Sequence, residues 1–341
     1  MLVSTTGVTS AQDVTAEAAP GSKYDGTANL AFSKDGRVLR EARTAYPEAQ
    51  GEFPHVRAIS YDAKTGKIVY VLDLAADTWF FSATTDGRIA IISLDRDRTE
   101  APVHLLRVDM ETGHTQKLPS NWFDADNHNP YAAISGDGKL VSAFSENGWG
   151  EGSEVVTLYE WRRKKPVAKQ SSGHSAGGID WGEVTADGKI AFGNSRMGRG
   201  IIDPKTGRAL TGYGPLSVRS PDGTWIVDFP NPSYGPETHE VPIRDGMNGQ
   251  AVGKLDLQLT DEEAGSWWHG AFCGKSGRFI AAGYDKVLAF EIPSGKKLLS
   301  LPLGTWQGPK QDKATPIVAC SPSGKRVAIR SGDRLTLHHL K

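Results

Sequence analysis

Hydrophobic and polar residues alternate in short runs along this chain, and each run ends at a turn that contains glycine. The recurring phrase is a small or apolar residue, a Ser or Thr, a tight turn and then an apolar strand. It occurs seven times, as AFSKDGRVL (31–39), SATTDGRIAI (82–91), AISGDGKLVSAF (133–144), EVTADGKIAFG (183–193), VRSPDGTWIVDF (218–229), AFCGKSGRFIAAG (271–283) and VACSPSGKRVAI (318–329). Alternation with a period of two is typical of β-strands, so the pattern predicts an all-β fold.

The spacing of the repeats predicts a propeller. Successive turn glycines lie 51, 51, 50, 35, 54 and 47 residues apart, which is room for about four short strands. A second hairpin follows most copies, as in YDAKTGKIVYVL (61–72) and IDPKTGRAL (202–210). Each unit is therefore interpreted as strands a, b, c and d with tight turns after a and c, and the chain as a seven-bladed β-propeller of four-stranded antiparallel blades.

Both ends of the chain bear on how the ring closes. The last unit stops after its third strand, at RLTLHHLK, and the first begins near Ala28. We expect a single domain over residues 1–341, with blades over 27–341 and a strand within residues 1–12, from Leu2 to Thr9, completing the last blade. Such closure removes an exposed sheet edge. A disordered amino-terminal tail is the alternative.

The S-P-D-G turn followed by a D-x-x-T-G-K hairpin resembles the WD40 repeat, from Ala28 onward. The Gly-His pair of that family survives clearly at Gly173-His174, whereas Tyr61-Asp62 and Ile202-Asp203 stand where Trp-Asp would be. The chain is thus similar to a divergent WD40-like propeller, and TolB-like, lactonase-like and quinoprotein-like propellers are possible relatives. The resemblance implies a binding scaffold.

Composition narrows the range of partners. With 39 Lys and Arg against 40 Asp and Glu, the formal net charge is -1, and no basic stripe favours nucleic acid. No apolar run is long enough to span a bilayer, and the amino end shows no secretory signal. We expect a soluble bacterial protein that is a monomer and does not bind membranes. Its localisation is open: the cytoplasm is favoured, and an exported or larger multidomain parent is the alternative.

The two cysteines fall at one equivalent position when the repeats are aligned on their turn glycines. Cys273 and Cys320 would then lie too far apart for a disulfide, and we expect two buried free thiols, in keeping with a reducing compartment. Arg219 occupies the same aligned position. It either reaches toward the central channel or marks a misaligned blade.

Metal and cofactor motifs are weak. The stretch from Asp124 to His128 alternates oxygen donors but lacks the glycine and distal Glu of an EF-hand loop, and the histidines show no zinc spacing. No metal and no cofactor is expected. The basic run Trp161 to Lys165 is interpreted as a solvated c–d turn.

Function is expected on the face that carries the long b–c and d–a loops, because loops on a rigid scaffold hold most binding residues. Aromatic and histidine side chains gather in these loops, and a polar-tipped aromatic buries a large area at low entropic cost. The predicted binding residues are Trp122, Phe123, His128, Trp149, His174, Tyr234, His239, Trp267, Trp268, His269 and Trp306. Alternatively, Trp181 and one of Trp267 or Trp268 stand at the start of the first strand (strand a) of their blades and pack between blades.

Three functions compete. The first is a non-enzymatic scaffold that binds a protein or peptide partner on the long-loop face, with no catalytic residues. The second is a hydrolase or lactonase at the channel mouth, for which Asp124, Asp126, Glu237, His239 and His269 are the candidates. The third is a quinoprotein-like redox enzyme, which would need a cofactor in the channel. A propeller fold alone does not choose among them.

Overall fold

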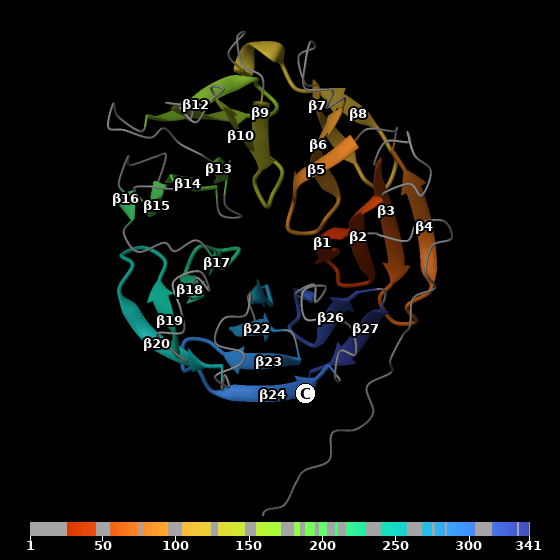
Figure 1. Ribbon diagram of the computed structural model, residues 1–341, viewed down its shortest axis with the longest axis vertical. Coiled ribbons are helices and arrows are strands. Elements are labelled where there is room, and N and C mark those ends of the chain that lie inside the picture. The colour runs from red at the N-terminus through yellow and green to blue at the C-terminus, as the bar shows by residue number, and fades with distance from the viewer. Residues whose placement is uncertain are drawn as a thin grey trace, which may run out of the picture.

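The computed structural model describes residues 26–45, 55–74, 78–94, 104–123, 129–146, 155–171, 181–184, 188–194, 198–202, 209–210, 216–229, 240–257, 268–274, 277–283, 285–303, 316–332 and 334–340. Its sheets stand in a ring around a central channel, and the chain passes from one sheet to the next in sequence order (Figure 1). In each sheet the strands run antiparallel, with the first nearest the axis. The predicted all-β propeller is confirmed.

Six of the sheets are four-stranded blades. Blade 1 holds β1 (Gly26–Phe32), β2 (Val38–Ala45), β3 (His55–Asp62) and β4 (Ile68–Asp73). Blade 2 holds β5 (Thr78–Ala83), β6 (Ile89–Leu94), β7 (His104–Asp109) and β8 (Thr115–Lys117). Blade 3 holds β9 (Asn129–Ile134), β10 (Leu140–Glu146), β11 (Val155–Glu160) and β12 (Lys165–Ser171).

Blade 4 holds β13 (Trp181–Val184), β14 (Ile190–Asn194), β15 (Gly198–Ile202) and β16 (Ala209–Leu210). Blade 5 holds β17 (Leu216–Arg219), β18 (Trp225–Phe229), β19 (Glu240–Asp245) and β20 (Ala251–Asp256). Blade 6 holds β21 (His269–Phe272), β22 (Arg278–Ala282), β23 (Lys286–Glu291) and β24 (Lys297–Pro302). A short 3-10 helix, η1 (Ser120–Trp122), joins blades 2 and 3.

The prediction of seven four-stranded blades is wrong. The described residues form six such blades, and the seventh repeat folds into a three-stranded C-terminal sheet of β25 (Ile317–Cys320), β26 (Arg326–Ser331) and β27 (Arg334–His339). The physical reason is that this repeat ends without a second hairpin, so the chain after β27 supplies no d strand. The expected closing strand, Leu2 to Thr9, lies outside the described residues.

Local hydrogen bonds explain why the repeated phrase folds as a hairpin. In blade 1 the Ser33 hydroxyl donates to Asp35 (2.6 Å) and accepts the backbone N–H of Val38 (3.0 Å). Gly36 sits at φ +70°, which a side chain would oppose. The same bonds recur around Thr84, Ser135 and Ser220. The Ser/Thr-x-Asp-Gly pattern is thus a capped turn.

The c–d turns use a different device. The carboxylate of Asp62 accepts the backbone N–H groups of Lys64 (3.0 Å) and Thr65 (2.7 Å), and Gly66 follows with φ +68°. The aspartates of this motif are therefore turn-forming groups. In blade 3, Lys164 takes the positive φ of +53° in place of glycine.

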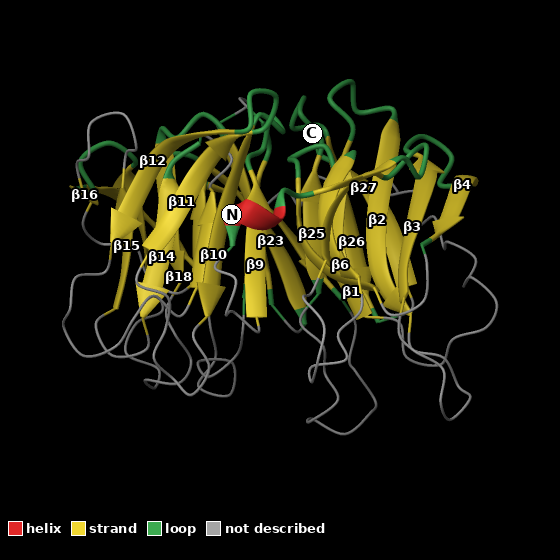
Figure 2. Cartoon of the chain, turned by 90° about the horizontal axis from the view of Figure 1, so that it is seen from above, coloured by secondary structure: helices red, strands yellow, loops and turns green. Residues whose placement is uncertain are grey.

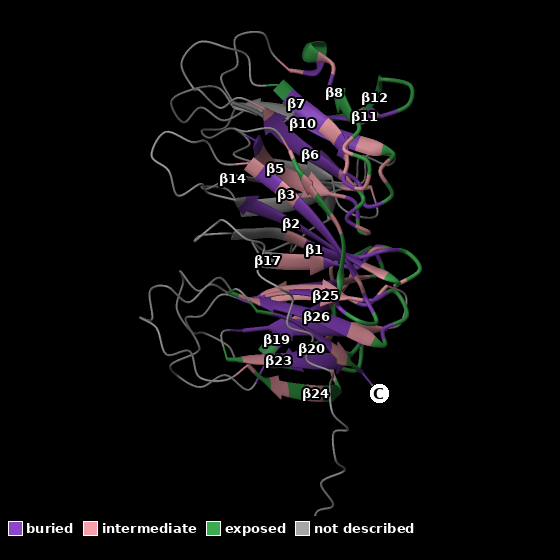
Figure 3. Ribbon diagram, turned by 90° about the vertical axis from the view of Figure 1, so that its right-hand side faces the viewer, coloured by how far each residue is buried: buried purple, intermediate pink, exposed green. Residues whose placement is uncertain are grey.

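The hydrophobic core lies between neighbouring sheets, and Figure 3 shows its buried residues in purple. Between blade 1 and the C-terminal sheet the contact includes a buried ion cluster. The Glu41 carboxylate lies 3.2 Å from Nε of both Arg43 and Arg330 and accepts the Tyr61 hydroxyl (2.8 Å). Burial, together with the adjacent Glu41 carboxylate, raises the pKa of Tyr61. This cluster joins β2, β3 and β26.

The prediction of two free thiols is wrong, because Cys273 and Cys320 form a disulfide with Cα atoms 4.8 Å apart. The a–b turn of blade 6 differs from the others in where its glycine falls. Cys273 bonds to Arg278 as Ser321 bonds to Arg326, so by hydrogen-bond register Cys273 is equivalent to Ser321. Alignment on the glycines was one residue out, and the two cysteines occupy different positions on adjacent sheets.

Candidate functional site

The strand directions give the propeller two unlike faces, shown edge-on in Figure 2. The short-turn face carries the a–b and c–d turns, and every a–b connection is five residues: 33–37, 84–88, 135–139, 185–189, 220–224, 273–277 and 321–325. The long-loop face carries the b–c and d–a connections, which vary from two residues (332–333) to fourteen (303–316). Variation in length is thus concentrated on the long-loop face.

Trp122 and Phe123 belong to a packed aromatic cluster. The Trp122 side chain is 6% exposed and stacks on Tyr159, with ring centroids 4.1 Å apart, while Trp161 meets it edge-on at 6.0 Å. Phe123 packs against the same cluster. Trp161 lies in the c–d turn of blade 3, so the cluster is near the short-turn face and stabilises the contact between blades 2 and 3.

Lys164 covers this cluster, with its ammonium group over the Trp161 ring. Burial and the nearby Arg107 guanidinium lower the pKa of Lys164 to about 8. Trp161 is buried, whereas the four basic residues that follow it are exposed, so the run is a solvated turn apart from its tryptophan.

Trp268 and His269 lie where the chain enters β21. Trp268 is 7% exposed and stacks on Phe229 of blade 5. The Nδ1 atom of His269 accepts the backbone N–H of Val318 (3.3 Å), which links blade 6 to the C-terminal sheet. Burial lowers the pKa of His269 to about 4, so the ring is neutral at pH 7. Both side chains contribute to contacts between sheets.

The remaining predicted binding residues lie outside the described residues: His128, Trp149, His174, Tyr234, His239, Trp267 and Trp306. Asp124, Asp126 and Glu237 do as well. Trp181 begins β13, but its side chain is not described. Within the described ranges, no three His, Cys, Asp or Glu residues lie close enough together to hold a metal ion. No helix in those ranges is long and apolar enough to cross a membrane.

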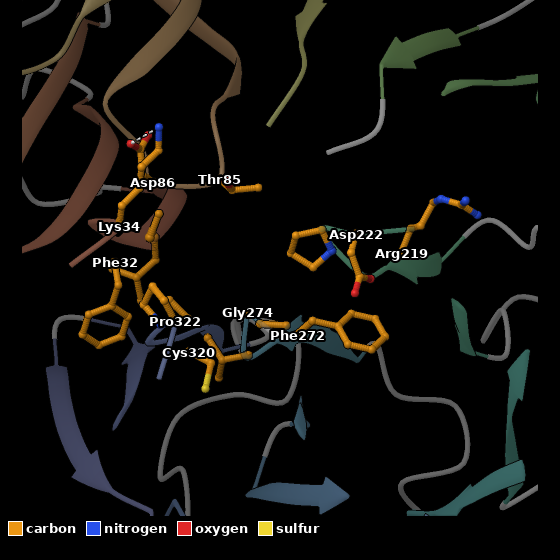
Figure 4. A pocket seen from close by; sticks show the side chains of 16 residues that line it. Phe32, Lys34, Thr85, Asp86, Arg219, Asp222, Phe272, Gly274, Cys320 and Pro322 are labelled. Atoms are coloured by element: carbon orange, nitrogen blue, oxygen red, sulfur yellow. Dashed lines mark ion pairs between the residues drawn. The ribbon is translucent and has the colours of Figure 1, made fainter. Parts of the chain in front are cut away.

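The described residues enclose a cavity of about 680 Å³ at the channel mouth on the short-turn face (Figure 4). The inner ends of blades 1, 2, 5 and 6 and of the C-terminal sheet meet there. Its lining is mostly apolar, with a few charged groups: Leu30, Ala31, Phe32, Lys34, Thr85, Asp86, Arg219, Pro221, Asp222, Ala271, Phe272, Gly274, Val318, Ala319, Cys320 and Pro322. A cavity of this size and composition suits a small ligand or an inserted side chain.

Close packing of two turns shapes one wall of the cavity. Gly274 has φ +53°, and a Cβ atom there would lie 2.6 Å from the carbonyl oxygen of Pro322. Only glycine allows this approach. The Cys273–Cys320 disulfide joins the same two sheets, so this wall is cross-linked.

Charges on the rim are distributed unevenly. Lys34 forms an ion pair with Asp86 (3.9 Å). Arg219 turns away from the cavity and donates to the carbonyl of Gly246 (2.9 Å), so it anchors a c–d turn (Figure 4). The Arg219 guanidinium therefore does not point into the channel, and its strand is not misaligned. Both arrangements considered for Arg219 are thus wrong.

Asp222 differs from the other acidic turn residues. Partial burial raises the pKa of its carboxyl. Hydrogen bonds from the Ser220 hydroxyl and from the Thr224 backbone N–H and hydroxyl outweigh burial, so the pKa lies below the ordinary value. The group is ionised at pH 7. In the a–b turns of blades 1, 2 and 3 the aspartate has a Lys or Arg partner within 4.0 Å, whereas no ion pair joins Asp222 to another described residue.

Sequence reasoning missed this cavity, although one signal was present. Four copies of the repeat read Asp-Gly-Arg or Asp-Gly-Lys, whereas the fifth reads Asp222-Gly223-Thr224. That copy keeps the turn carboxylate and lacks the adjacent cation. The convergence of Phe272 and Pro322 on the same cavity has no sequence signature, because these residues come from separate repeats.

No family model matches this chain, and no curated protein matches it. Solved structures do match. One is described as "Crystal Structure of Mitotic Checkpoint Complex", and a chain of that structure superposes with a TM-score of 0.58 and 15% sequence identity over 100% of both chains. Identity this low establishes the fold alone. The comparison confirms, at the level of architecture, the propeller fold that the turn motifs predicted and its resemblance to WD40-like propellers.

Proposed function

We propose that this chain is a non-enzymatic interaction module that binds a protein or peptide partner through its long-loop face. A WD40-like scaffold supports a protein-interaction role in general. The contrast between the two faces carries the finer proposal: all seven a–b connections have one length, whereas the long-loop face holds segments as different as 195–197 and 303–316. Connections that can vary without disturbing the strands are where recognition residues accumulate.

The buried positions of Trp122 and Trp268 determine which variants can test the proposal. Replacing either with Ala would open a cavity between sheets and cost roughly 3–5 kcal/mol of stability. A loss of binding would then be uninterpretable. Trp149 and Trp306 occupy the long b–c and d–a connections and are the substitutions of choice.

The experiment is affinity capture from extract of the native host with wild-type protein and with the Trp149→Ala/Trp306→Ala variant, followed by reconstitution with each captured protein. Lys139→Ala, an exposed a–b turn variant, is the matched control for the opposite face. We expect the tryptophan variant to lose the reconstituted partner while Lys139→Ala retains it and both variants keep the wild-type Tm. Retained binding by the tryptophan variant would refute the proposed face.

A further inference from the structure

The geometry points to a second binding site, on the face opposite the proposed partner surface: the short-turn mouth of the channel binds an organic cation, a guanidinium or primary ammonium group on an apolar stem, with Asp222 as its counter-ion. The site does not depend on the proposed partner surface. Its wall residues come from four-stranded blades and from the C-terminal sheet.

The first step of the argument is charge. Among the described residues, four charged side chains line the cavity, and two of them, Lys34 and Asp86, form an ion pair (3.9 Å). The Arg219 guanidinium points away and bonds to a backbone carbonyl. The carboxylate of Asp222, by contrast, points into the cavity (Figure 4). Of the charged groups in the described lining, the Asp222 carboxylate is therefore the one that faces the cavity outside an ion pair.

The second step is the orientation of the Asp222 oxygens. The Ser220 hydroxyl (2.7 Å) and the Thr224 backbone N–H (3.0 Å) both donate to Oδ1. These bonds, together with one from the Thr224 hydroxyl, fix the carboxylate. A carboxylate has about four acceptor positions, so acceptor capacity remains for a ligand. A charge-assisted hydrogen bond from guanidinium or ammonium to a fixed carboxylate is among the stronger polar contacts in proteins.

The third step is the apolar lining. Phe272 and Pro322 lie on the cavity wall, and Phe272 is held by an edge-on contact with Phe279, with centroids 4.8 Å apart. An aromatic face attracts a cation, and apolar walls gain free energy from burying an alkyl stem. An anion would meet Asp222, and a fully apolar ligand would leave that carboxylate desolvated without a partner. A cation on an apolar stem satisfies both parts of the lining.

The chain supplies a matched control carboxylate. Asp137 makes the same turn in blade 3, accepting the Ser135 hydroxyl (2.8 Å) and the Lys139 backbone N–H (3.0 Å). It also forms an ion pair with Lys139 at 2.7 Å and does not line the cavity. Asp137→Asn therefore perturbs the turn as Asp222→Asn does, without changing the site.

The test is calorimetric titration of the full chain with n-butylguanidinium chloride and with its neutral isostere n-butylurea. We expect wild type and Asp137→Asn to bind the cation and not the urea, and Asp222→Asn to bind it about tenfold more weakly, the loss expected for one charge-assisted hydrogen bond. Equal binding of cation and urea, no binding of the cation, or an equal effect of the two substitutions would overturn the proposal. The comparison of the two ligands on wild type needs no variant to fold.

A third ligand distinguishes the sources of such a cation. Acetyl-Gly-Arg-Gly-amide carries the same guanidinium on a peptide backbone. Binding of the peptide at the Asp222 site assigns it to an arginine side chain of a partner. Binding of butylguanidinium without the peptide assigns it to a small free cation.

Discussion

Removing the Cys273–Cys320 disulfide tests the structure where it differs most from expectation. The bond closes a loop between cysteines 47 positions apart and joins the a–b turn of blade 6 to the inner strand of the C-terminal sheet. By the chain-entropy relation, freeing a loop of this length costs about 4 kcal/mol at 25 °C. With an unfolding entropy of about 2.1 cal/mol/K per residue, that cost corresponds to a fall in Tm of roughly 6 °C for a chain of 341 residues.

Calorimetry of oxidised protein, reduced protein and the Cys273→Ala/Cys320→Ala variant checks this value. Reduced and variant protein should melt at similar temperatures, both below the oxidised protein, and reductant should leave the variant unchanged. Thiol titration of the unreduced, denatured chain should find no free thiol. Two free thiols, or identical Tm values with and without reductant, would refute the bond.

Three further predictions concern buried charges and titrating groups. Glu41→Ala should lower the free energy of unfolding by about 3–5 kcal/mol in urea denaturation, because it removes the carboxylate that lies 3.2 Å from the buried Arg330 guanidinium. An effect below about 1 kcal/mol would contradict the buried cluster. The His269 imidazole should stay neutral down to about pH 4 in an NMR titration. Because the ring of the unfolded chain titrates near 6.5, the unfolded state binds more protons between these pH values, and the free energy of unfolding falls by up to about 3 kcal/mol as the pH drops through them. The His269→Gln variant should lose that part of the pH dependence. Lys164, with its pKa lowered to about 8, should be acylated at pH 8 in mass-spectrometric mapping. Arg107→Gln should reduce the acylation of Lys164, because it removes a positive charge that lowers the pKa of Lys164. Unchanged acylation in that variant would contradict the role of Arg107.

The strands and hairpins could be predicted because their causes are local. A Ser or Thr, an Asp and a Gly within five residues make their own hydrogen bonds, as around Ser33, wherever the phrase occurs. The count of complete blades was wrong at the C-terminal sheet. Its repeat has the a–b phrase without a second hairpin, and the fourth strand was expected from Leu2 to Thr9, which lie outside the described residues.

Pairing between sheets was harder to predict. The cysteine assignment failed because the turn glycine of blade 6 stands one residue later relative to the hydrogen bonds than in the other blades, and sequence alone does not show that shift. The side chains of Trp122 and Trp268 are as aromatic as any binding residue, and only their partners Tyr159 and Phe229 reveal that they pack in the interior.

The cavity was out of reach for a third reason. Its lining comes from five sheets, so no stretch of sequence contains it. The absence of a cation after Asp222 is visible in the sequence, but its meaning depends on the direction of the side chain.

Hydrogen–deuterium exchange on the complex with a reconstituted partner tests the proposed partner face most directly. The account predicts that binding slows exchange in peptides covering the long connections, such as 46–54, 147–154 and 303–316, while the a–b turns at 33–37 and 135–139 exchange as in the free protein. Slowing confined to the a–b and c–d turns, with the long connections unchanged, would contradict it.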